Sequence, residues 1–518
     1  MNIMVGFTII TGNIQRIKQE KENGAVYVYD RTPYYDPSTK NTKYHYKYVG
    51  KDVDGKVSRV RSTLPRESII YGPFIPMMDI VSAYSLDEML MKYVTESECN
   101  AILSLSIAKV VRPLPIRSTG SWYEGTYLSK ALPADLSSQR ISELLEKIGE
   151  SSIYRYFSSD LIAKWKPSGS LFYDITTIPS YSSASIFEYG HSKDHPELEK
   201  INFSLTLEKN HRMPLSYEIF PGSIPDVATL ERAMEFFAPI MGEVLWVLDR
   251  AFFSAHNLRM LNDTGFIVAA SMHRKEIKSV FSRASRTVDR ADNVILYEGR
   301  TIFSIPVSFS IEDMQLKGFF YHDPERESSE MSDFHRNLAQ RREAIEKLEV
   351  RRGIRRTIES IAGDYIRYTS YRIEGKRITT RARNNAISAY ENRMGRFLLV
   401  TNANISSMEC LSIYRERDRI EKAFRTLKTD LDVFPLREHT ESTVRGILFI
   451  FFLSMIIRSA LLRAMDSTKL SRKYSIESLL IELEKLHMIV DQSGSLRELE
   501  RTKKQKDILE ALSSISWW

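Results

Sequence analysis

Apolar and polar residues alternate near the N-terminus, and this period of two predicts β-strands. Residues 26–30 and 43–49 alternate on either side of a turn-rich segment, which predicts a hairpin. Its second strand places His45 and Lys47 on one face and three tyrosines on the other: Tyr44, Tyr46 and Tyr48. The pattern is typical both of a ribbon that stacks on nucleic acid and of a half-buried hairpin.

From about residue 77 to residue 162 the apolar positions recur every three or four residues, which predicts helices. Two helix-length segments flank the sequence Gly149-Glu150-Ser151. They fit a DNA-binding helix-turn-helix and, equally, a simple helical hairpin.

Residues 171 to 270 predict strands interleaved with helices. The predicted strands are 171–177, 202–208, 215–220, 244–248 and 266–270, and the predicted helices are 226–241 and 256–262. A run of strands followed by alternating helices and strands predicts a mixed sheet covered by helices.

The alternation of predicted strands and helices ends near residue 275, and we expect an insertion into this fold there. Strand-like stretches are 301–309, 318–321, 371–380 and 396–401. A helical arm predicted from His335 to Glu359 carries three pairs of adjacent arginines, at 341–342, 351–352 and 355–356. This arm fits a DNA phosphate backbone and also a solvated helical hairpin.

Two more helices are predicted toward the C-terminus, an apolar one at 447–462 and an amphipathic one at 476–490. The most apolar run, Ile447 to Ile457, is short for a bilayer, and Arg458 follows it directly. We therefore expect a buried core helix here and not a membrane span.

The segment LSIYRERDRIEKAFRTLKTDLDVF, Leu411 to Phe434, predicts one helix whose charges border its apolar face. At roughly 100° per residue, four side chains fall within about 60° of one another: Tyr414, Arg417, Glu421 and Lys428. The apolar stripe beside them is Ile413, Ile420, Phe424, Leu427 and Leu431. Asp418 falls on the far side, in reach of Arg415 or Lys422.

Composition narrows the class of protein. The 518 residues are 43% hydrophobic and 27% charged, as in a soluble protein of two to four domains. The net charge of +7 favours an anionic partner, and nucleic acid is the commonest one. Cys99 and Cys410 form neither a zinc pattern nor a disulfide framework, which favours a reducing compartment. We expect no signal peptide, because no basic segment precedes the weakly apolar start.

Two aspartates lie where a charge is costly unless it is paired or bound to a metal. Asp174 is inside the apolar strand LFYDITT, and Asp249 ends the strand in LWVLDRAFF. Each alone also fits a capping or salt-bridged residue. Sites are often built at such strand ends, and Glu421 supplies a third carboxylate. Three oxygen ligands suit Mg²⁺ or Mn²⁺, and a pair of such ions promotes phosphoryl displacement.

The chain resembles the DDE transposases of prokaryotic insertion sequences, in the cut-and-paste group with a Y-R-E-K signature. Tyr414, Arg417, Glu421 and Lys428 match the signature spacing without a gap. The sequences FYDITT at Asp174 and VLDRAFFS at Asp249 resemble the first two acidic motifs. The resemblance covers about residues 165–465 and includes the stretches 189–205, 220–226 and 395–402.

The resemblance implies an α/β fold with a ribonuclease H-like mixed sheet, flanking helices and a β-rich insertion, preceded by N-terminal β and helical DNA-binding regions. The expected domains are an N-terminal β-rich region (1–75), a helical DNA-binding region (76–165), a first part of the catalytic core (166–274), an insertion domain (275–400), a second part of the core (401–465) and a C-terminal helical region (466–518).

The resemblance further implies an enzyme that cleaves the ends of its own element and joins the freed 3′-hydroxyl to target DNA. Asp174, Asp249 and Glu421 are then the catalytic ligands of two Mg²⁺ ions, for which Mn²⁺ substitutes. The residues implied to bind DNA are Tyr414, Arg417, Lys428, Arg250 and Lys193. An aromatic residue of the insertion would hold a flipped base, and its candidates are Tyr365, Tyr368 and Tyr371.

The implied partners are double-stranded DNA, at the transposon ends and at the target, and a second copy of the chain in a synaptic homodimer. No membrane is involved, and the expected location is the cytoplasm, in association with the nucleoid. Two alternatives stay open. A catalytically silent DNA-binding descendant of a transposase does not need intact carboxylates, and a ribonuclease H-like nuclease such as a resolvase does not need the Y-R-E-K spacing.

Overall fold

The computed structural model describes residues 14–21, 24–36, 39–58, 65–181, 184–189, 198–239, 244–272, 274–426, 431, 436, 440–491 and 494–515. The chain forms two compact units. Unit 1 contains residues 1–72 and 484–501, and unit 2 contains residues 73–483 and 502–518.

Unit 1 contains two small antiparallel sheets. The first has the order β1-β2-β3-β4, from β1 (Gln15–Glu20), β2 (Val26–Asp36), β3 (Asn41–Val53) and β4 (Lys56–Ser58). The second has the order β18-β17-β5, from β18 (Leu496–Glu498), β17 (His487–Val490) and β5 (Glu67–Ile70). The predicted N-terminal hairpin is confirmed as β2–β3. The helix predicted at 476–490 is wrong in its last third, because residues 487–490 hydrogen-bond to β5 as a strand.

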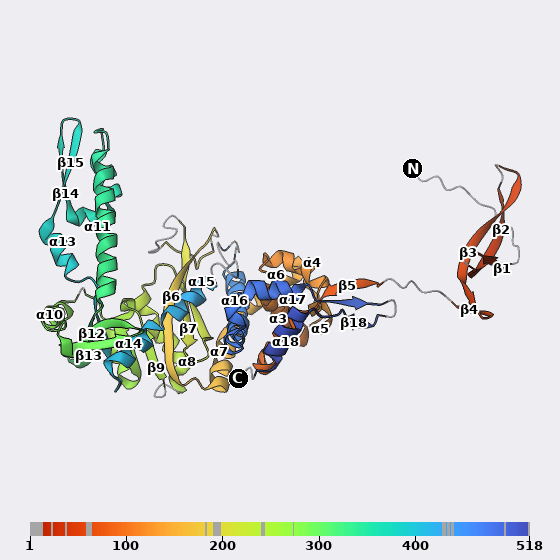
Figure 1. The fold of residues 1–518 in the computed structure, drawn as a ribbon, viewed down its shortest axis with the longest axis horizontal. Helices are drawn as coiled ribbons and strands as arrows, with labels where there is room; N and C mark the ends of the chain where they lie inside the picture. Colours follow the sequence, from red (N-terminus) through yellow and green to blue (C-terminus); the bar gives the residue numbers. More distant parts are fainter. Residues whose placement is uncertain are drawn as a thin grey trace. The chain divides into compact units, whose positions relative to one another are not determined.

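Unit 2 is a mixed α/β structure around one large sheet with helices packed against it (Figure 1). In the described residues this sheet has the strand order β11-β12-β13-β16-β10-β9-β6-β7-β8. Its strands are β6 (Gly169–Pro179), β7 (Lys200–Glu208), β8 (Met213–Pro221), β9 (Val244–Leu248), β10 (Gly265–Ala269), β11 (Val294–Tyr297), β12 (Arg300–Ile311), β13 (Met314–His322) and β16 (Arg396–Thr401). The pairs β6–β9 and β9–β10 are parallel.

Three of the four strand-like stretches expected in the insertion belong to this sheet, and the fourth, 371–380, lies in a separate hairpin. β16 pairs antiparallel with β10 on one side and with β13 on the other, which joins β11, β12 and β13 to the core strands. Periodicity alone could not reveal this, because pairing between distant strands is a tertiary choice.

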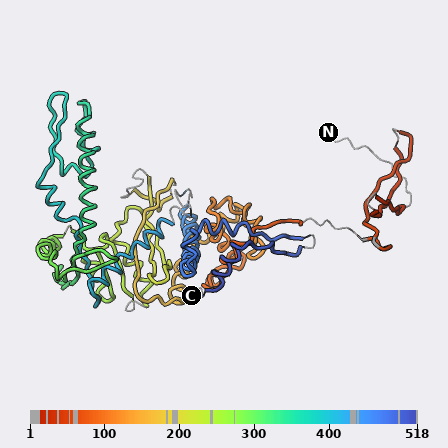
Figure 2. Tube along the Cα trace, in the orientation of Figure 1, coloured from red at the N-terminus to blue at the C-terminus, as the bar shows by residue number. Residues whose placement is uncertain are grey.

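Between β13 and β16 the chain forms an arm. It consists of α11 (Pro324–Glu346), α12 (Ile354–Ala362), the hairpin β14 (Thr369–Glu374) and β15 (Arg377–Ala382), and α13 (Asn384–Glu391). Figure 2 shows α11 and the hairpin running side by side away from the sheet. The single arm helix predicted from His335 to Glu359 is wrong. α11 ends at Glu346 and α12 begins after Gly353, whose φ of +82° is a left-handed conformation that suits glycine.

Helices surround the sheet on the rest of unit 2. Those before the sheet are α1 (Phe74–Ala83), α2 (Leu86–Leu90), α3 (Glu96–Val111), α4 (Thr119–Glu124), α5 (Leu128–Ala131), α6 (Ser138–Glu150) and α7 (Ile153–Trp165). Those within or after it are α8 (Leu230–Phe237), α9 (Ala255–Met260), α10 (Lys275–Ala284), α14 (Ser407–Arg415), α15 (Asp418–Arg425), α16 (Glu441–Ser467), α17 (Ile476–Glu484) and α18 (Lys503–Ser513).

The apolar helix α16 is the centre of the packing between these helices and the sheet. It contacts α3 and α6 on one side and β8 on the other. Among the described residues it has the length and hydropathy of a membrane span, and 78% of its most apolar window is buried inside the protein. The buried core helix expected from Ile447 to Ile457 therefore matches the position of α16 within the fold.

Two glycines let α6 and α16 approach until their backbones touch. A Cβ on Gly149 would lie 1.7 Å from the Ser442 carbonyl oxygen, and a Cβ on Gly446 would lie 2.0 Å from the Leu145 carbonyl oxygen. Neither oxygen can rotate away as a side chain would. Any larger residue must therefore push the two helices apart.

We expect Gly446→Ala to lower the free energy of unfolding by about 1–3 kcal/mol, the usual cost of overpacking a close-packed interior. Gly125→Ala is the matched control, because its Cβ would meet only the Trp122 carbonyl oxygen, at 3.6 Å. Denaturant unfolding followed by circular dichroism measures both. Equal stability of the two variants would contradict the close approach of the helices.

Candidate active site

The register of two parallel strands places Asp174 beside Asp249. In the β6–β9 pair Tyr173 lies opposite Leu248, and each aspartate follows one of these residues. β9 ends at Leu248, whereas β6 continues to Pro179 in its pairing with β7. The two carboxylates therefore emerge together at the carboxyl end of β9, in the centre of the sheet.

Asp249 is oriented by its own backbone and by a tyrosine. It caps the short 3₁₀ turn Arg250–Phe252, where its Oδ1 accepts a hydrogen bond from the Arg250 N–H at 2.7 Å. The hydroxyl of Tyr414 donates to the same Oδ1 at 3.4 Å. Burial, and then the nearby carboxylates, raise the pKa of Tyr414, while Arg417 lowers it, so the phenol keeps its proton.

The helix predicted from Leu411 to Phe434 is interrupted. α14 ends at Arg415 and α15 begins at Asp418, and the Arg417 N–H bonds to the Tyr414 carbonyl three residues back. Of the predicted apolar stripe, Ile413, Ile420, Phe424 and Leu431 are buried as expected, and Leu427 lies outside the described residues. The two helices still present Tyr414, Arg417 and Glu421 to the aspartates.

Arg417 lies among three carboxylates. Its Nη1 is 3.1 Å from Asp174 Oδ2 and 3.8 Å from Asp249 Oδ2, and its Nη2 is 3.1 Å from Glu421 Oε1. The exposed fraction of the side chain is 14% for Arg417, 18% for Asp174 and 54% for Glu421. A single guanidinium thus balances carboxylates from β6, from the end of β9 and from α15.

One positive charge does not fully balance this site. Burial raises the pKa of Asp174 from 3.8 to about 7, even though Arg417 and the Ile175 N–H pull it down, and Asp249 and Glu421 add to the rise. Arg417 Nε is buried and has no hydrogen-bond partner among the described residues. The three carboxylates therefore satisfy the hydrogen-bond donors of Arg417 only in part.

This donor set has the chemistry for a hard divalent cation, since carboxylate oxygens are the ligands that Mg²⁺ and Mn²⁺ prefer. The spacing does not yet suit an ion. In the described part of the chain no three carboxylate, histidine or cysteine side chains lie close enough to ligate one metal. Asp174, Asp249 and Glu421 are spread around Arg417, so the guanidinium must move before they can converge.

The other predicted site residues are placed differently. Lys428 and Lys193 lie outside the described residues. Arg250 is exposed in the 3₁₀ turn after Asp249. Asp418 is exposed in the first turn of α15. Its predicted solvent exposure is confirmed, and of its two expected partners, Arg415 and Lys422, Arg415 bonds instead to Asp323, at 2.5 Å.

Sequence reasoning missed this link between the arm and the helix that carries Tyr414. Asp323 is buried, caps the start of α11 through the Arg326 N–H, and also receives Arg415 from α14. The Asp323-Pro324 pair is a helix-start signature that would have located the beginning of α11. The ion pair with Arg415 left no signal in the sequence.

The three tyrosines proposed to hold a flipped base pack inside the arm. Tyr368 is buried in a cluster with Phe334, and Tyr365 stacks on Phe334 with ring centroids 5.5 Å apart. Tyr371 packs against the cluster around Ile378. None of the three is as exposed as Tyr390, at 42%.

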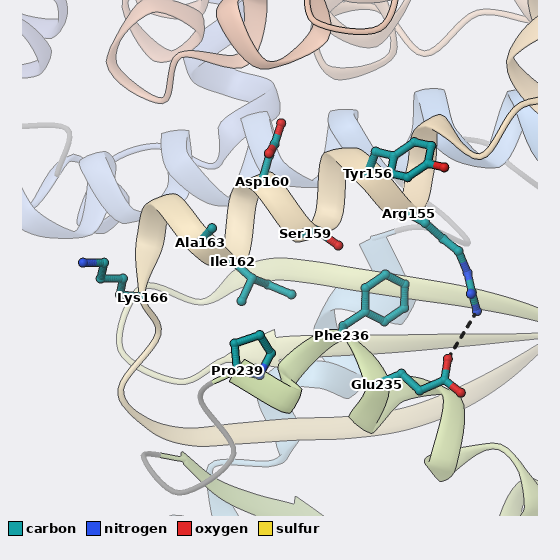
Figure 3. Close-up of a pocket in the computed structure, with 10 residues that line it drawn as sticks. All are labelled: Arg155, Tyr156, Ser159, Asp160, Ile162, Ala163, Lys166, Glu235, Phe236 and Pro239. Atoms are coloured by element: carbon teal, nitrogen blue, oxygen red, sulfur yellow. Dashed lines mark ion pairs between the residues drawn. The ribbon is translucent and has the colours of Figure 1, made fainter.

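A cavity of ≈ 790 Å³ lies elsewhere in unit 2, between α7 and the C-terminal end of α8. Figure 3 shows Ile162, Phe236 and Pro239 facing this space, with an ion pair between Arg155 and Glu235 at its rim. No residue that lines it belongs to the carboxylate cluster. The carboxylate cluster therefore lies at the carboxyl end of the central strands and not in this cavity.

The raised pKa of Asp174 predicts a pH-dependent stability in metal-free buffer. The folded protein binds more protons than the unfolded chain between about pH 4 and about pH 7, so ionising Asp174 in this window destabilises the fold. We expect Asp174→Asn to gain stability relative to the wild type as pH rises from 4 toward 7. Denaturant unfolding in EDTA at several pH values measures this, and a pH-independent difference would contradict the shift.

Comparisons with known proteins bear on this geometry. No curated protein matches the chain. One solved structure aligns over 80% of each chain, with 10% sequence identity and a TM-score of 0.37. Its title is "Cryo-EM structure of piggyBac transposase synaptic complex with hairpin DNA (SNHP)". Residues 169–457, more than half of the chain, match the family described as "Transposase DDE domain" and include Asp174, Asp249, Tyr414, Arg417 and Glu421. The chain therefore belongs to the DDE transposase family and is a DNA transposase.

Proposed function

We propose that the chain is the transposase of a prokaryotic insertion sequence, in the Y-R-E-K group, that binds the terminal inverted repeats of its element, cleaves the ends and joins the 3′-hydroxyl to target DNA. The observation that carries this proposal is the cluster of Asp174, Asp249 and Glu421 around Arg417. Carboxylates from two strands and a helix meet there, although they are far apart in the sequence.

We infer a ribonuclease H-like catalytic core within the large sheet. Its support is the strand order β8-β7-β6-β9-β10, in which β8, β7 and β6 are antiparallel and β6, β9 and β10 are parallel. This order places the first two carboxylates on neighbouring central strands.

The cofactor that we propose is Mg²⁺, as two ions for which Mn²⁺ substitutes, held by Asp174, Asp249 and Glu421. Such ions, when bound, activate the attacking hydroxyl group and stabilise the leaving oxygen of a phosphodiester. Two contacts within the chain support the role of Asp249. The Tyr414 hydroxyl keeps Asp249 oriented, and the capped turn after β9 keeps its carboxylate at the strand end.

Arg417 has two roles in this proposal. Without a divalent cation, its guanidinium offsets part of the negative charge of the three carboxylates, which would otherwise repel one another more strongly. When a cation takes that position, the guanidinium needs a new anion within reach of its side chain. A phosphate oxygen of the DNA end at the same site provides that anion, and bidentate contact with phosphate suits arginine.

The distal arm, residues 340–383, is the second DNA contact that we propose. It holds thirteen lysines and arginines against six acidic residues, so its net charge of +7 equals that of the entire chain. Arg341 and Arg342 are used within the arm, where they donate to the Ile361 carbonyl and to Thr380. The exposed arginines around the start of α12 are Arg351, Arg352, Arg355 and Arg356.

We further propose that the chain works as a homodimer on two transposon ends, in the cytoplasm and in association with the nucleoid. A catalytically silent descendant is the competing function. The intact ring of ion pairs around Arg417 favours the enzyme, because a decayed site has no reason to keep all three carboxylates.

We expect Glu421→Gln to abolish Mg²⁺-dependent cleavage of terminal-repeat DNA and to leave DNA binding intact. Glu421 is more than half exposed, so its replacement should not unfold the chain. Asp418→Asn is the matched control on the same helix and should cleave normally. Gel-based cleavage and fluorescence anisotropy measure the two activities. Retained cleavage by Glu421→Gln, or abolished cleavage by Asp418→Asn, would refute the assignment of the third carboxylate.

We expect the double variant Arg355→Ala and Arg356→Ala to weaken binding to all DNA sequences. It should lower the slope of log affinity against log salt by about 0.9 for each phosphate that the arm no longer neutralises. The control is Lys503→Ala with Lys504→Ala, which removes the same charge from exposed positions of α18. Titrations at several salt concentrations measure the slope. An equal effect in both double variants would mean that only the net charge matters.

A further inference from the structure

One face of the β1–β3 sheet in unit 1 carries a continuous row of aromatic rings. Pairing in register fixes this face, because Tyr29 lies opposite Tyr48, Arg31 opposite Tyr46 and Pro33 opposite Tyr44. Tyr27, two residues before Tyr29, lies on the same side, and the bulge at Val49 brings Lys51 opposite Tyr27. The tyrosines of this face, here called the tyrosine face, are Tyr27, Tyr29, Tyr35, Tyr44, Tyr46 and Tyr48.

The two faces of the sheet differ in their acidic residues. The carboxylates of its first three strands all lie on the opposite face, at alternate positions: Glu20, Asp30, Asp36 and Asp52. There they meet cations, as in the pairs of Arg16 with Asp30 and of Lys43 with Asp36. The tyrosine face has Arg31 and Lys51 and, in the described strands, no carboxylate.

The rings are open to solvent and close enough to act together. Tyr44, Tyr46 and Tyr48 are 38%, 53% and 43% exposed. The centroids of Tyr44 and Tyr46 are 6.4 Å apart, and those of Tyr29 and Tyr48 are 5.5 Å apart. The Arg31 guanidinium lies over the Tyr44 ring, 4.3 Å from its centroid.

This sheet buries little of its own surface. Its buried residues are Ala25, Val28 and Gly50, and the described elements of unit 1 are all strands, so no helix of this unit covers either face. Figure 1 shows β2 and β3 as a long twisted pair. The tyrosine face is therefore built for a ligand that offers flat rings and negative charge.

We propose that the tyrosine face binds unpaired bases of a DNA strand. Bases stack on aromatic side chains without sequence preference, and arginine and lysine meet the phosphates between them. An extended strand can follow β3, where successive outward residues are Tyr44, Tyr46 and Tyr48. The inference rests on the proposed function, in which DNA is the substrate of this chain. A protein partner fits less well, because Ile17 and Pro33 are the only non-aromatic apolar side chains that the structure describes on this face.

The test uses the full chain with Tyr44, Tyr46 and Tyr48 all changed to alanine, and labelled oligo(dT) as the probe. Fluorescence anisotropy should show a loss of about tenfold or more in affinity for oligo(dT), because stacking is removed at three positions. Affinity for blunt duplex DNA and cleavage of terminal-repeat DNA should be unchanged. The same three positions changed to phenylalanine keep the flat rings and should bind oligo(dT) as the wild type does.

The control changes the stacked pair on the opposite face, Tyr34→Ala with His45→Ala, whose ring centroids are 4.3 Å apart. It should leave oligo(dT) binding unchanged. Three results would overturn the proposal: no binding of oligo(dT) by the wild type, unchanged binding by the alanine variant, or an equal loss in the control. Loss of self-association in place of DNA binding would also overturn it and assign the face to a second copy. Because duplex cleavage is read separately, failure here leaves the proposed catalytic function untouched.

Discussion

The structure around the candidate active site depends on one electrostatic constraint. Three carboxylates lie close together, and their mutual repulsion must be offset by a positive charge. Arg417 meets this constraint by contacting Asp174, Asp249 and Glu421 at once. The compensation is incomplete, as the raised pKa of Asp174 indicates. A site in this condition gains from a stronger cation. The uncompensated negative charge that lowers the stability of the metal-free protein is therefore the same charge that favours the binding of a divalent cation.

The fold supplies the rigidity that this constraint needs. Parallel pairing of β6 and β9 sets the spacing of the two aspartates by backbone hydrogen bonds, which side-chain motion cannot change. The third carboxylate comes from a helix anchored by Ile420 and Phe424, both buried. α16 then packs the sheet against the N-terminal helices through backbone contact at Gly149 and Gly446. Only the charged groups at the strand ends are left free to rearrange.

Much of this could be predicted from the sequence where local patterns decide the structure. Strands such as 244–248 and 396–401 were found at their observed bounds, since burial on both faces leaves a clear apolar signal. The meeting of Asp174, Asp249, Arg417 and Glu421 followed from motifs. The break after Arg415 was missed, because a helical wheel assumes a straight helix, whereas Arg415 and Arg417 are held by partners far away in the sequence. The turn from α17 into β17 was missed for the same reason, since its partner β5 lies more than 400 residues earlier.

The ion pair between Asp323 and Arg415 gives the arm a mechanical connection to the catalytic helix. Asp323 begins α11, and Arg415 is the neighbour of Tyr414, which orients Asp249. A displacement of the arm at its base would therefore reach Tyr414 and the Asp249 carboxylate through this one ion pair. Contact of the positively charged distal arm with an anion would in that way be felt at the carboxylate cluster.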